Sequence, residues 1–350
     1  MPNHQTYMQR CLELALLGAG NIGAGAMVGA VIVHNNKIIG EGYHMKYGEA
    51  HAEVNAIKDA IEKNQDAIEL LKNSIIYVSL EPCAHFGKTP PCSDLIIKHK
   101  IPTVVIGCRD PFDQVDGKGV EKLKNAGINI IEGILSEECL DVNKRFFTRV
   151  QKQRPYIILK WAQTADAFFA PIDGNKRWIT SETSKALVHK WRSEEDAILV
   201  GKNTALIDNP KLNVREWRGK NPIRIAIDRN LELPNTLHLF DQSQKTIIFN
   251  AHKTEVVENI TFIELEDFDN LLPQLIAYQL YLLDIQSIIV EGGAKTLELF
   301  IKANLWDEAR VFSGPDHWES GIPAPLITGK LLIEQEIGSD ILRTYKNSHP

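Results

Sequence analysis

The chain has 350 residues, of which 44% are hydrophobic and 24% are charged, and its formal net charge is −6. Because one domain usually holds about 100–200 residues, this length predicts two domains. A negative net charge argues against general binding to nucleic acid or to anionic membranes, since both attract basic surfaces. The sequence also lacks an apolar run of roughly 18 residues that could span a membrane, and its start does not resemble a signal peptide. We therefore expect a cytoplasmic protein without a membrane partner.

Hydrophobic periodicity predicts alternating helices and strands in the first half of the chain. The expected order is helix 7–18, strand 28–33, a hairpin strand over 37–44, helix 51–64, strand 74–80, a helix that opens at Cys92, strand 103–108, helix 120–127 and strand 128–134. This alternation is typical of an α/β layered sheet.

The composition changes to polar and basic residues over 141–155, and Pro155 then precedes a new apolar segment. We place the domain boundary near 146–154 and divide the chain into residues 1–147 and 148–350. The second half also alternates, with strands expected at 156–164, 197–201, 223–228, 245–250 and 287–290. Both domains are thus predicted to be of the α/β class.

The strongest motif combines His51 and Glu53 in HAE with Cys83 in EPC and with Cys92. Zinc prefers imidazole and thiolate ligands, and a catalytic zinc keeps three protein ligands and one open position. Bound zinc lowers the pKa of its water toward about 7, and a carboxylate that is not a ligand can carry the protons, as in the zinc deaminases. Residues i and i+2 do not share a helix face, so His51 is expected at the entry of its helix.

A structural zinc site is the alternative, and it would need a fourth protein ligand, for which His85 and then Cys108 are the candidates. The odd cysteine count and the absence of a secretion signal favour reduced thiols over disulfides. Cys11, Cys108 and Cys139 are therefore interpreted as buried thiols. The presence of Glu53 beside the ligand motif favours catalysis.

Four segments together resemble the bifunctional deaminase/reductases of riboflavin biosynthesis, and the resemblance continues over nearly the whole chain. These segments are VGAVIV at 28–33, GEGYH at 40–44, GEAHAEV at 48–54 and LEPCAHFGKTPPC at 80–92. Nucleic-acid and nucleoside deaminases usually keep the two cysteines closer together. The resemblance implies a cytidine-deaminase-like three-layer α/β/α domain followed by a dihydrofolate-reductase-like α/β domain, and a homo-oligomer.

In the first domain the resemblance implies that Glu53 is catalytic and that zinc binds His51, Cys83 and Cys92. The implied reaction releases ammonia from a diaminopyrimidinone ribosyl phosphate, a small phosphorylated pyrimidine. The implied substrate-binding residues are His44, His85 and Lys88, of which the last is a plausible phosphate anchor. The family has Pro-Asn-Pro where this chain has Ala24, Gly25 and Ala26.

The second domain resembles the family's reductase in segments 159–167, 177–182, 189–215 and 288–298. The resemblance implies NADPH as cofactor and reduction of the ribosyl group to ribityl. The implied cofactor positions are Ala162, Trp178, Thr204, Asp208, Gly293, Ala294, Lys295 and Thr296. The implied substrate positions are Lys160, Asp166, Lys176, Arg192, Leu212, Arg215 and Glu291. A strand, a Gly-Gly turn and a helix over 288–298 would form an anion site for the dinucleotide.

Two further positions depart from the family, which usually has glycine at 167 and a small or hydroxyl residue at 202, where this chain has Ala167 and Lys202. Together with the 24–26 segment, they leave two alternatives to the bifunctional enzyme. One is an impaired or non-catalytic homologue that binds the pathway's phosphorylated ligands. The other, a nucleic-acid base deaminase, would need a basic groove with stacking aromatics, which the net charge disfavours.

Overall fold

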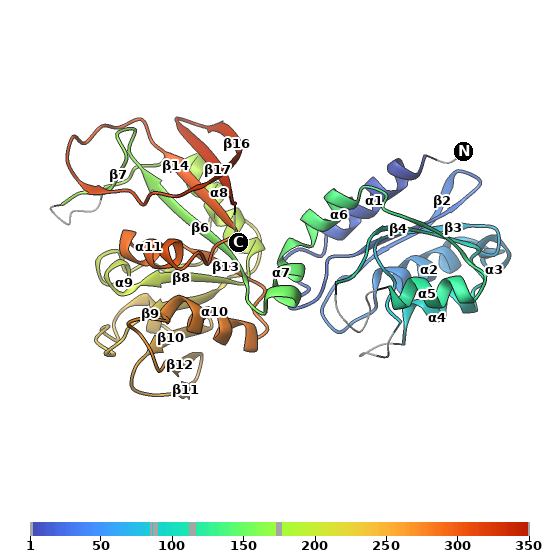
Figure 1. Ribbon diagram of the computed structural model, residues 1–350, viewed down its shortest axis with the longest axis horizontal. Helices are drawn as coiled ribbons and strands as arrows, with labels where there is room; N and C mark the ends of the chain where they lie inside the picture. Colours follow the sequence, from blue (N-terminus) through green and yellow to red (C-terminus); the bar gives the residue numbers. More distant parts are fainter. Residues whose placement is uncertain (1–2, 85, 87–89, 112–116, 173–176, 349–350) are drawn as a thin grey trace. The chain divides into compact units, whose positions relative to one another are not determined.

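The computed structural model describes residues 3–84, 86, 90–111, 117–172 and 177–348, and the chain forms two compact units, Met1–Gln153 and Arg154–Pro350 (Figure 1). Each unit is built around a β-sheet with its own hydrophobic core, as the two-domain prediction requires. None of the described helices combines the length and the apolar character that crossing a bilayer demands.

The first unit contains a five-stranded sheet in the order β2-β1-β3-β4-β5. Its strands are β1 (Gly29–His34), β2 (Lys37–Tyr43), β3 (Ile75–Leu80), β4 (Thr103–Cys108) and β5 (Asn129–Glu132). The β1–β2 hairpin and the β1–β3 pair are antiparallel, whereas β3, β4 and β5 run parallel. The central strands are buried on both faces, which explains their nearly unbroken runs of β-branched residues.

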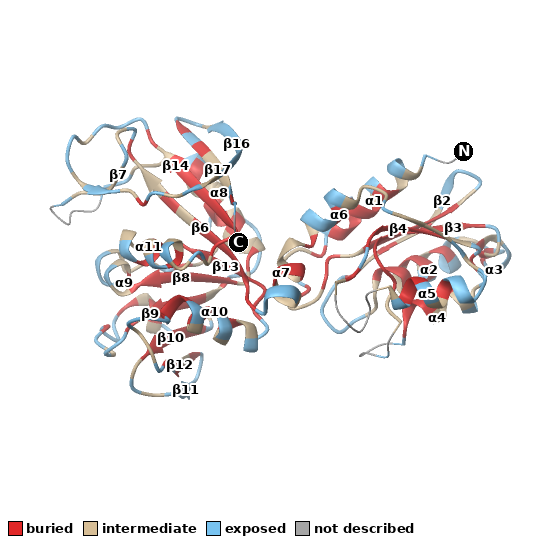
Figure 2. Cartoon of the chain, viewed as in Figure 1, coloured by how far each residue is buried: buried red, intermediate tan, exposed pale blue. Residues whose placement is uncertain are grey.

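Helices cover both faces of this sheet and complete the expected three layers. They are α1 (His4–Leu16), α2 (Ala52–Lys63), α3 (Ala67–Leu71), α4 (Cys92–Lys98), α5 (Lys118–Asn125), α6 (Ser136–Val142) and α7 (Lys144–Lys152). One apolar core lies between the sheet and the α2 side, and another includes residues of α1, α6 and α7 on the opposite face. Figure 2 shows the buried residues concentrated along the strands and on the inward sides of the helices.

The second unit contains a ten-stranded sheet in the order β11-β12-β10-β9-β8-β13-β6-β14-β17-β16, beside a small β15–β7 pair. Seven consecutive strands of this sheet, from β12 to β14, run parallel to one another. The strands are β6 (Tyr156–Gln163), β7 (Phe168–Ala170), β8 (Ala197–Gly201), β9 (Ile223–Ile227), β10 (Thr246–Asn250), β11 (Glu255–Val257), β12 (Ile260–Glu264), β13 (Ser287–Val290), β14 (Glu308–Ser313), β15 (Ile322–Pro323), β16 (Gly329–Ile337) and β17 (Asp340–Asn347).

The helical elements of this unit are α8 (Glu182–Glu194), α9 (Lys202–Asp208), the 3-10 helix η1 (His238–Phe240), α10 (Leu272–Leu282) and α11 (Ala294–Lys302). Strand β13 comes late in the chain yet lies between β6 and β8, so the strand order reverses there. In open α/β sheets, ligands bind beyond the carboxyl ends of the strands at such a switch point. A ligand site is therefore expected at the carboxyl ends of β6, β13 and β8.

A buried ion pair fixes the first residue of the second unit. The guanidinium of Arg154 donates to both carboxylate oxygens of Asp307, at 2.6 and 2.8 Å, and Asp307 also accepts from the backbone N–H of Ile157. Both charged side chains are more than nine-tenths buried. This pair ties the residue that follows Gln153 to the sheet of the second unit.

The sequence marked the segment around 141–155 only by its polar and basic residues, whereas the structure forms helix α7 there directly after α6. The helix buries Phe147 and Thr148, and of its charged residues Lys152 is exposed whereas Lys144, Arg145 and Arg149 are half-buried. A helix of nine residues is marginally stable on its own in water, so packing against the rest of the unit stabilises α7.

Candidate functional site

His51 lies at the entry of α2, as the sequence required. It occupies the N-cap position with an extended backbone, φ −70° and ψ 168°, and the helix begins at Ala52. Its backbone carbonyl already accepts a hydrogen bond from the N–H of Asn55. The break in helical geometry separates the directions of the His51 and Glu53 side chains, although they are only two positions apart.

The ligand atoms of His51, Cys83 and Cys92 form one cluster, within 4.8 Å of one another. The Nδ1 atom of His51 lies 3.7 Å from Sγ of Cys83 and 3.4 Å from Sγ of Cys92. Tetrahedral zinc, with Zn–S of about 2.3 Å and Zn–N of about 2.1 Å, separates nitrogen and sulfur ligands by about 3.6 Å. The donor atoms therefore fit a zinc ion, with three protein ligands and one position left for water.

Hydrogen bonding prepares the two cysteines for metal binding. Cys92 donates to Cys83 from its thiol and its backbone N–H, and with His51 it lowers the pKa of Cys83 to about 4. The same contact raises the pKa of Cys92, because the two sulfurs share one proton. A thiolate is the form that binds metal, so the lowered pKa of Cys83 favours metal binding.

Glu53 lies in the first turn of α2 and is 3% exposed. Burial raises the pKa of its carboxyl group to about 7, although the nearby His51 opposes this shift. A carboxyl group with a pKa near neutrality both accepts and releases protons at physiological pH. Glu53 therefore has the environment of a general acid and base beside the metal cluster.

His44 lies beside the metal cluster, with its ring centroid 5.4 Å from that of His51. Its Nδ1 atom is 3.1 Å from the carbonyl oxygen of Ala26, which accepts a hydrogen bond from the Nδ1–H tautomer. Within the described residues its Nε2 atom is buried without a partner, so it is available to a ligand. Burial lowers the pKa of His44. The predicted substrate residues His85 and Lys88 lie outside the described residues.

Gly25 lies beside His44, at a position where the family has asparagine. A Cβ atom added at Gly25 would lie 3.1 Å from Cε1 of His44 and 3.4 Å from Tyr47. The imidazole of His44 therefore lies against the space that a side chain at position 25 would enter.

Glu81 supports the metal loop, and the sequence analysis did not single it out. Its carboxylate is 4% exposed and accepts hydrogen bonds from the N–H groups of Gly117, Gly119 and Val120 at the start of α5. Gly119 approaches so closely that a Cβ there would lie 1.9 Å from the carbonyl oxygen of Pro82. Glu81 thus holds the backbone just before Cys83 against a helix N-terminus, where the macrodipole favours a carboxylate. The glutamate of the EPC motif was the available sequence signal.

Cys108 does not join the metal cluster. It is buried, and its thiol donates to the carbonyl oxygen of Ser79 on the neighbouring strand. Cys11 and Cys139 are also buried free thiols, as expected. Among the described residues, the cluster therefore has three ligands of the zinc-binding kind, and the other candidate fourth ligand, His85, is not described.

A second group of charged side chains lies at the switch point of the large sheet. Lys160 on β6 is aligned with Glu291, the residue after β13, because Leu159 pairs with Val290. Arg192 from α8 donates to both carboxylate oxygens of Glu291, at 3.2 and 2.7 Å. Burial alone would raise the pKa of Glu291, but the positive charges of Arg192 and Lys160 lower it to about 2. Burial lowers the pKa of Lys160.

The segment after α9 extends this charged group. Leu212 is buried with a positive φ of 49°, and the backbone N–H of Arg215 donates a long hydrogen bond to Nδ1 of His189. His189 is 2% exposed and contributes to the electrostatics of Glu291. The sequence did not indicate this histidine, because one histidine in a helix gives no separate signal.

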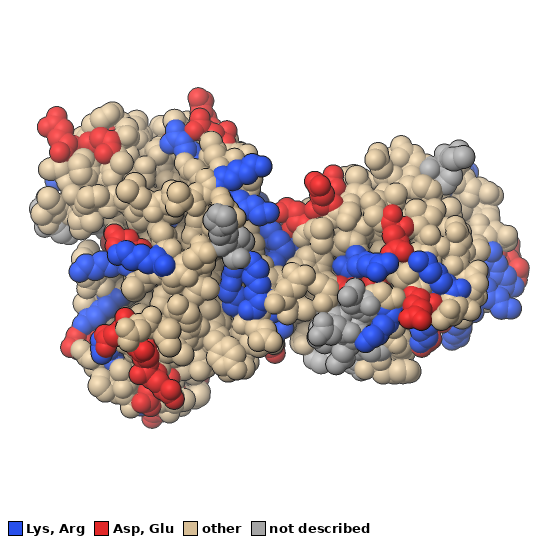
Figure 3. Space-filling view, in the orientation of Figure 1, with Lys and Arg blue, Asp and Glu red and all other residues tan. Residues whose placement is uncertain are grey.

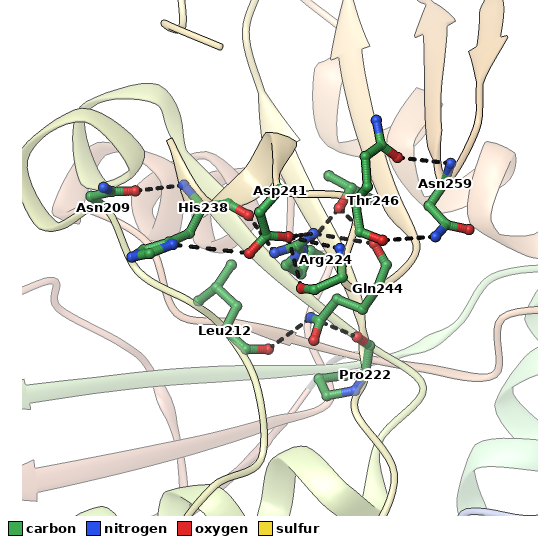
Figure 4. Close-up of polar contacts among 11 residues, drawn as sticks. Asn209, Leu212, Pro222, Arg224, His238, Asp241, Gln244, Thr246 and Asn259 are labelled. Carbon is green, nitrogen blue, oxygen red and sulfur yellow. Dashed lines mark hydrogen bonds and ion pairs between the residues drawn. The ribbon is translucent and has the colours of Figure 1, made fainter. Parts of the chain in front are cut away.

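Figure 4 shows how a buried arginine supports the same segment. Arg224 on β9 donates to Thr246, to the carboxylate of Asp241 and to the backbone carbonyls of His238 and Gln244. The amide of Gln244 in turn donates to the carbonyl oxygens of Leu212 and Pro222. The backbone at Leu212 is thereby attached to the core of the second unit.

Asp166 has a different environment from the other predicted substrate residues. Its carboxylate accepts from the hydroxyl of Thr164 and from the backbone N–H groups of Trp318 and Glu319. These hydrogen bonds lower its pKa. The carboxylate thus holds two loops together. Lys176, another predicted substrate residue, lies outside the described residues.

The strand, turn and helix predicted over 288–298 are present as β13, a Gly292-Gly293 turn and α11. A Cβ at Gly292 would lie 2.5 Å from backbone atoms of β8, so only glycine fits there. Gly293 is the N-cap of α11, with φ 48°, and Thr204 lies beside it. The N-terminus of α11, with Ala294, Lys295 and Thr296, thus opens next to the end of β8.

The remaining predicted cofactor positions are spread more widely. Ala162 is half-buried near the end of β6, and Asp208 ends α9. Trp178 is 61% exposed, and the ammonium of Lys185 lies 4.0 Å from its ring centroid. Their side chains are accessible or half-accessible, as a cofactor surface requires, and they lie on separate elements.

Comparisons with known proteins find relatives of both halves of the chain. Residues 1–108 match the family of the cytidine and deoxycytidylate deaminase zinc-binding region, and residues 155–316 match the RibD C-terminal domain family. The riboflavin biosynthesis protein RibD of Aquifex aeolicus is 40% identical over 91% of this chain and 88% of its own length. The Escherichia coli RibD is 34% identical over 88% and 87%.

Solved structures show the same relationship. A diaminohydroxyphosphoribosylaminopyrimidine deaminase/5-amino-6-(5-phosphoribosylamino)uracil reductase from Thermotoga maritima superposes with a TM-score of 0.90, at 36% identity, over 98% of each chain. Acinetobacter baumannii RibD gives a TM-score of 0.87 at 30% identity, again over 98% of each chain. The chain therefore belongs to the RibD family of riboflavin biosynthesis, bifunctional enzymes that join a zinc-dependent deaminase to an NADPH-dependent reductase.

Proposed function

We propose that this chain deaminates 2,5-diamino-6-ribosylamino-4(3H)-pyrimidinone 5′-phosphate and then reduces the ribosyl group of the product to ribityl. In this proposal, residues 1–147 perform the first reaction and residues 148–350 perform the second. The observation that carries it is the cluster of His51, Cys83 and Cys92, whose donor distances fit tetrahedral zinc beside a buried Glu53. Relatives with these paired activities support the order of the reactions.

The residues of the deaminase site have separate roles in this proposal. Zinc, when bound, supplies an acidified water at the open position. Glu53 would take a proton from that water and pass it to the amino group as the C–O bond forms and the C–N bond breaks, and the remaining hydroxyl proton would move to the adjacent ring nitrogen, so that ammonia leaves and a carbonyl forms. The pKa of Glu53, about 7, suits both of its transfers. His44 offers its Nε2 atom to the pyrimidine, and Lys88 is proposed to bind the phosphate with His85 nearby.

In the reductase site, NADPH supplies the hydride, and the protein binds and orients the two reactants. We propose that the Gly293 turn and the first turn of α11 bind the dinucleotide, with Ala162, Trp178, Thr204 and Asp208 along its length. Lys160 and Glu291 would face the ribosyl group. Arg192 and Arg215 are proposed to bind the phosphate, with Lys176, Leu212 and Asp166 as further substrate-binding residues.

The partner of this protein is thus a small phosphorylated pyrimidine, and nucleic acid is not a proposed partner. On the visible face of each unit most of the surface carries neither acidic nor basic side chains (Figure 3). Single-stranded nucleic acid requires a continuous basic groove with stacking aromatics, which the net charge of −6 disfavours. We further propose a homo-oligomer in the cytoplasm, as the family resemblance implies.

The test measures the two half-reactions separately on one zinc-loaded preparation. Ammonia release should follow addition of the diaminopyrimidine substrate, and NADPH absorbance should fall when the deaminated product is supplied. Removing zinc with a chelator should abolish the first reaction and leave the second unchanged. A metal-loaded protein that performs neither reaction would contradict the proposal.

A second candidate function is ligand binding without turnover. Two observations favour it, namely that Gly25 offers no side chain to the pyrimidine pocket and that Ala167 is in the left-handed region with φ 65°. This candidate predicts binding of the substrate and of NADPH without ammonia release. It further predicts that restoring Asn at 25 and Gly at 167 switches activity on, and it fails if the native chain turns over at ordinary rates.

A further inference from the structure

Asn143 makes a two-pronged contact with a backbone segment 116 residues away. Its side-chain oxygen accepts from the N–H of Met27 at 2.8 Å, and its side-chain nitrogen donates to the carbonyl oxygen of Met27 at 2.9 Å. Asn143 is 1% exposed and lies between α6 and α7, where its own carbonyl accepts from the N–H of Phe147. The side-chain amide of Asn143 thus makes the same pair of hydrogen bonds to Met27 that the backbone of a neighbouring β-strand residue would make.

The other edge of the same segment holds His44. The carbonyl oxygen of Ala26 lies 3.1 Å from Nδ1 of His44, and the carbonyl oxygen of Val28 accepts from the backbone N–H of His44 at 2.9 Å. Successive carbonyls of an extended chain point to opposite edges. Residues 26–28 therefore lie between two partners, with Met27 bonded to Asn143 and its two neighbours bonded to His44.

This arrangement determines which nitrogen of His44 faces the pocket. A proton on Nδ1 is held by Ala26, so the Nε2 atom keeps its lone pair, and within the described residues that buried atom has no partner. If residues 26–28 shifted, the carbonyl of Ala26 would no longer fix the tautomer or the ring orientation. The position of His44 thus depends on a segment that Asn143 anchors from the outer edge.

The local sequence gives the segment little support of its own. Residues 23–26 read Gly-Ala-Gly-Ala, so they have no polar side chain and no proline to restrict the backbone. Chains without such restrictions lose more conformational entropy on folding. Anchoring from outside the segment is therefore of greater consequence here than in a loop stiffened by proline.

We propose that Asn143 is a positioning residue of the deaminase site, one that holds residues 26–28 so that Nε2 of His44 accepts a hydrogen bond from the pyrimidine substrate. This inference rests on the proposed function of the first unit. Asn143 itself touches neither the substrate nor the zinc ligands, and its effect passes through Met27, Ala26 and His44.

The experiment compares Asn143→Ala and Asn143→Asp with Asn64→Ala in the full-length, zinc-loaded protein. Asn64 is a matched control, because its amide also donates to two backbone carbonyls of the first unit, those of Ile39 and Ala60, but at the end of α2. Deaminase kcat and KM, zinc content and reductase activity are measured on each variant.

Asn143→Ala should raise the deaminase KM about tenfold, the size expected when a buried hydrogen-bond pair is lost. The change in kcat should be smaller, with zinc content and reductase activity as in the native chain. Asn143→Asp keeps the acceptor for the N–H of Met27 but loses the donor to the carbonyl oxygen of Met27. It should therefore also raise the deaminase KM more than it changes kcat. If Asn143→Ala does not fold, Asn143→Asp decides the question. A KM no higher than that of Asn64→Ala would overturn the inference.

A spectroscopic readout separates this inference from the proposed function. Long-range proton–nitrogen correlation spectra of histidine-labelled protein distinguish the two tautomers, and the His44 signal is assigned by its absence in His44→Phe. The native chain and Asn64→Ala should show the Nδ1–H tautomer, which Asn143→Ala should lose. An unchanged His44 tautomer in Asn143→Ala overturns the inference even if the native chain is active. No ammonia release from a native chain with the expected spectra contradicts the proposed function instead.

Discussion

The two sites of this chain are built in different ways. At the zinc cluster, three donor atoms lie within 4.8 Å of one another and come from two short motifs, each at the start of a helix or just before one. At the switch point of the large sheet, Lys160, Arg192 and Glu291 come from a strand, a helix and a strand end that are up to 131 residues apart in the sequence, from 160 to 291.

This difference predicts how each site fails. In the zinc cluster each residue has its own chemical role, so one substitution should remove one function and leave the structure intact. In the charged group Lys160, Arg192 and Glu291 interact in a buried environment, so removing one of them takes its charge and its hydrogen bonds away from the others. Single substitutions therefore test the comparison directly.

The largest effect is expected from Glu53→Gln. Glutamine is nearly isosteric but cannot carry a proton, and general acid–base groups contribute about 10²- to 10⁴-fold to rates. Ammonia release should fall about 10³-fold, with zinc content and reductase activity unchanged. Glu62→Gln, at an exposed position of the same helix, is the control and should have no effect. Loss of zinc together with activity would show that Glu53 is structural.

Arg192→Met should have the next largest effect, and it should act on the other reaction. The ion pair of Arg192 with Glu291 has side chains only 12% and 8% exposed, so its loss leaves Glu291 with Lys160 as partner. We expect the reductase kcat/KM to fall about 100-fold, with normal deaminase activity. Arg229→Met breaks the exposed pair with Asp269 and should change neither rate. A similar loss in both variants would refute the special role of the buried pair.

The zinc cluster was predictable from the sequence because its chemistry is local. His51, Glu53, Cys83 and Cys92 occur in short motifs, and even the position of His51 at the helix entry followed from the i, i+2 spacing. The alternation of strands and helices was also predictable from periodicity. The contacts that support the site were not, since Glu81 acts on α5 through backbone N–H groups that have no sequence signature.

A pH-dependent stability difference tests the reductase segment that Figure 4 shows. Burial raises the pKa of Asp241, but hydrogen bonds from Arg224 and Ser243 outweigh burial and lower this pKa from its usual 3.8 to about 2. A lowered native-state pKa contributes stability above the unfolded value, and that contribution is lost as the pH falls toward 2. Since its side chain is 35% exposed, the contribution should not exceed about 1 kcal/mol.

Asp241→Asn should therefore lower the free energy of unfolding of the second unit at about pH 6, and the difference from the native chain should narrow between about pH 4 and pH 2. Denaturant unfolding at several pH values measures this. A difference that stays constant over the whole range would mean that the ion pair contributes nothing and that only the hydrogen bonds matter.

The reductase site was less predictable because it depends on long-range contacts. The family resemblance supplied Arg192 and Glu291 separately, but only the parallel register of β6 and β13 brings Lys160 beside Glu291. The support of Leu212 by Gln244 and Arg224 and the approach of Gly292 to β8 likewise depend on tertiary packing. Asp166 was predicted to bind substrate. In the structure its carboxylate accepts hydrogen bonds from Thr164 and from the backbone N–H groups of Trp318 and Glu319.

The smallest expected effect comes from Ala167→Gly, and it has the opposite sign. Ala167 lies at a turn with φ 65°, a region that glycine enters without the steric cost that a Cβ imposes. Relief of this strain should stabilise the second unit by about 1 kcal/mol, less the greater entropy of glycine in the unfolded chain. Ala165→Gly, at an exposed position of the same turn without a positive φ, should destabilise instead.

Thermal unfolding followed together with reductase kinetics makes this change informative in two ways. A more stable variant with unchanged kinetics would mean that Ala167 strains the turn but leaves the active site intact. If the KM for NADPH also falls, the Cβ of Ala167 obstructs the cofactor, and the chain has an impaired reductase beside an intact zinc cluster. A less stable variant would contradict the strain argument, because the hydrogen bonds of the turn, from Ala167 to Thr164 and from Ala324 to Ala167, involve only backbone atoms and are open to glycine as well.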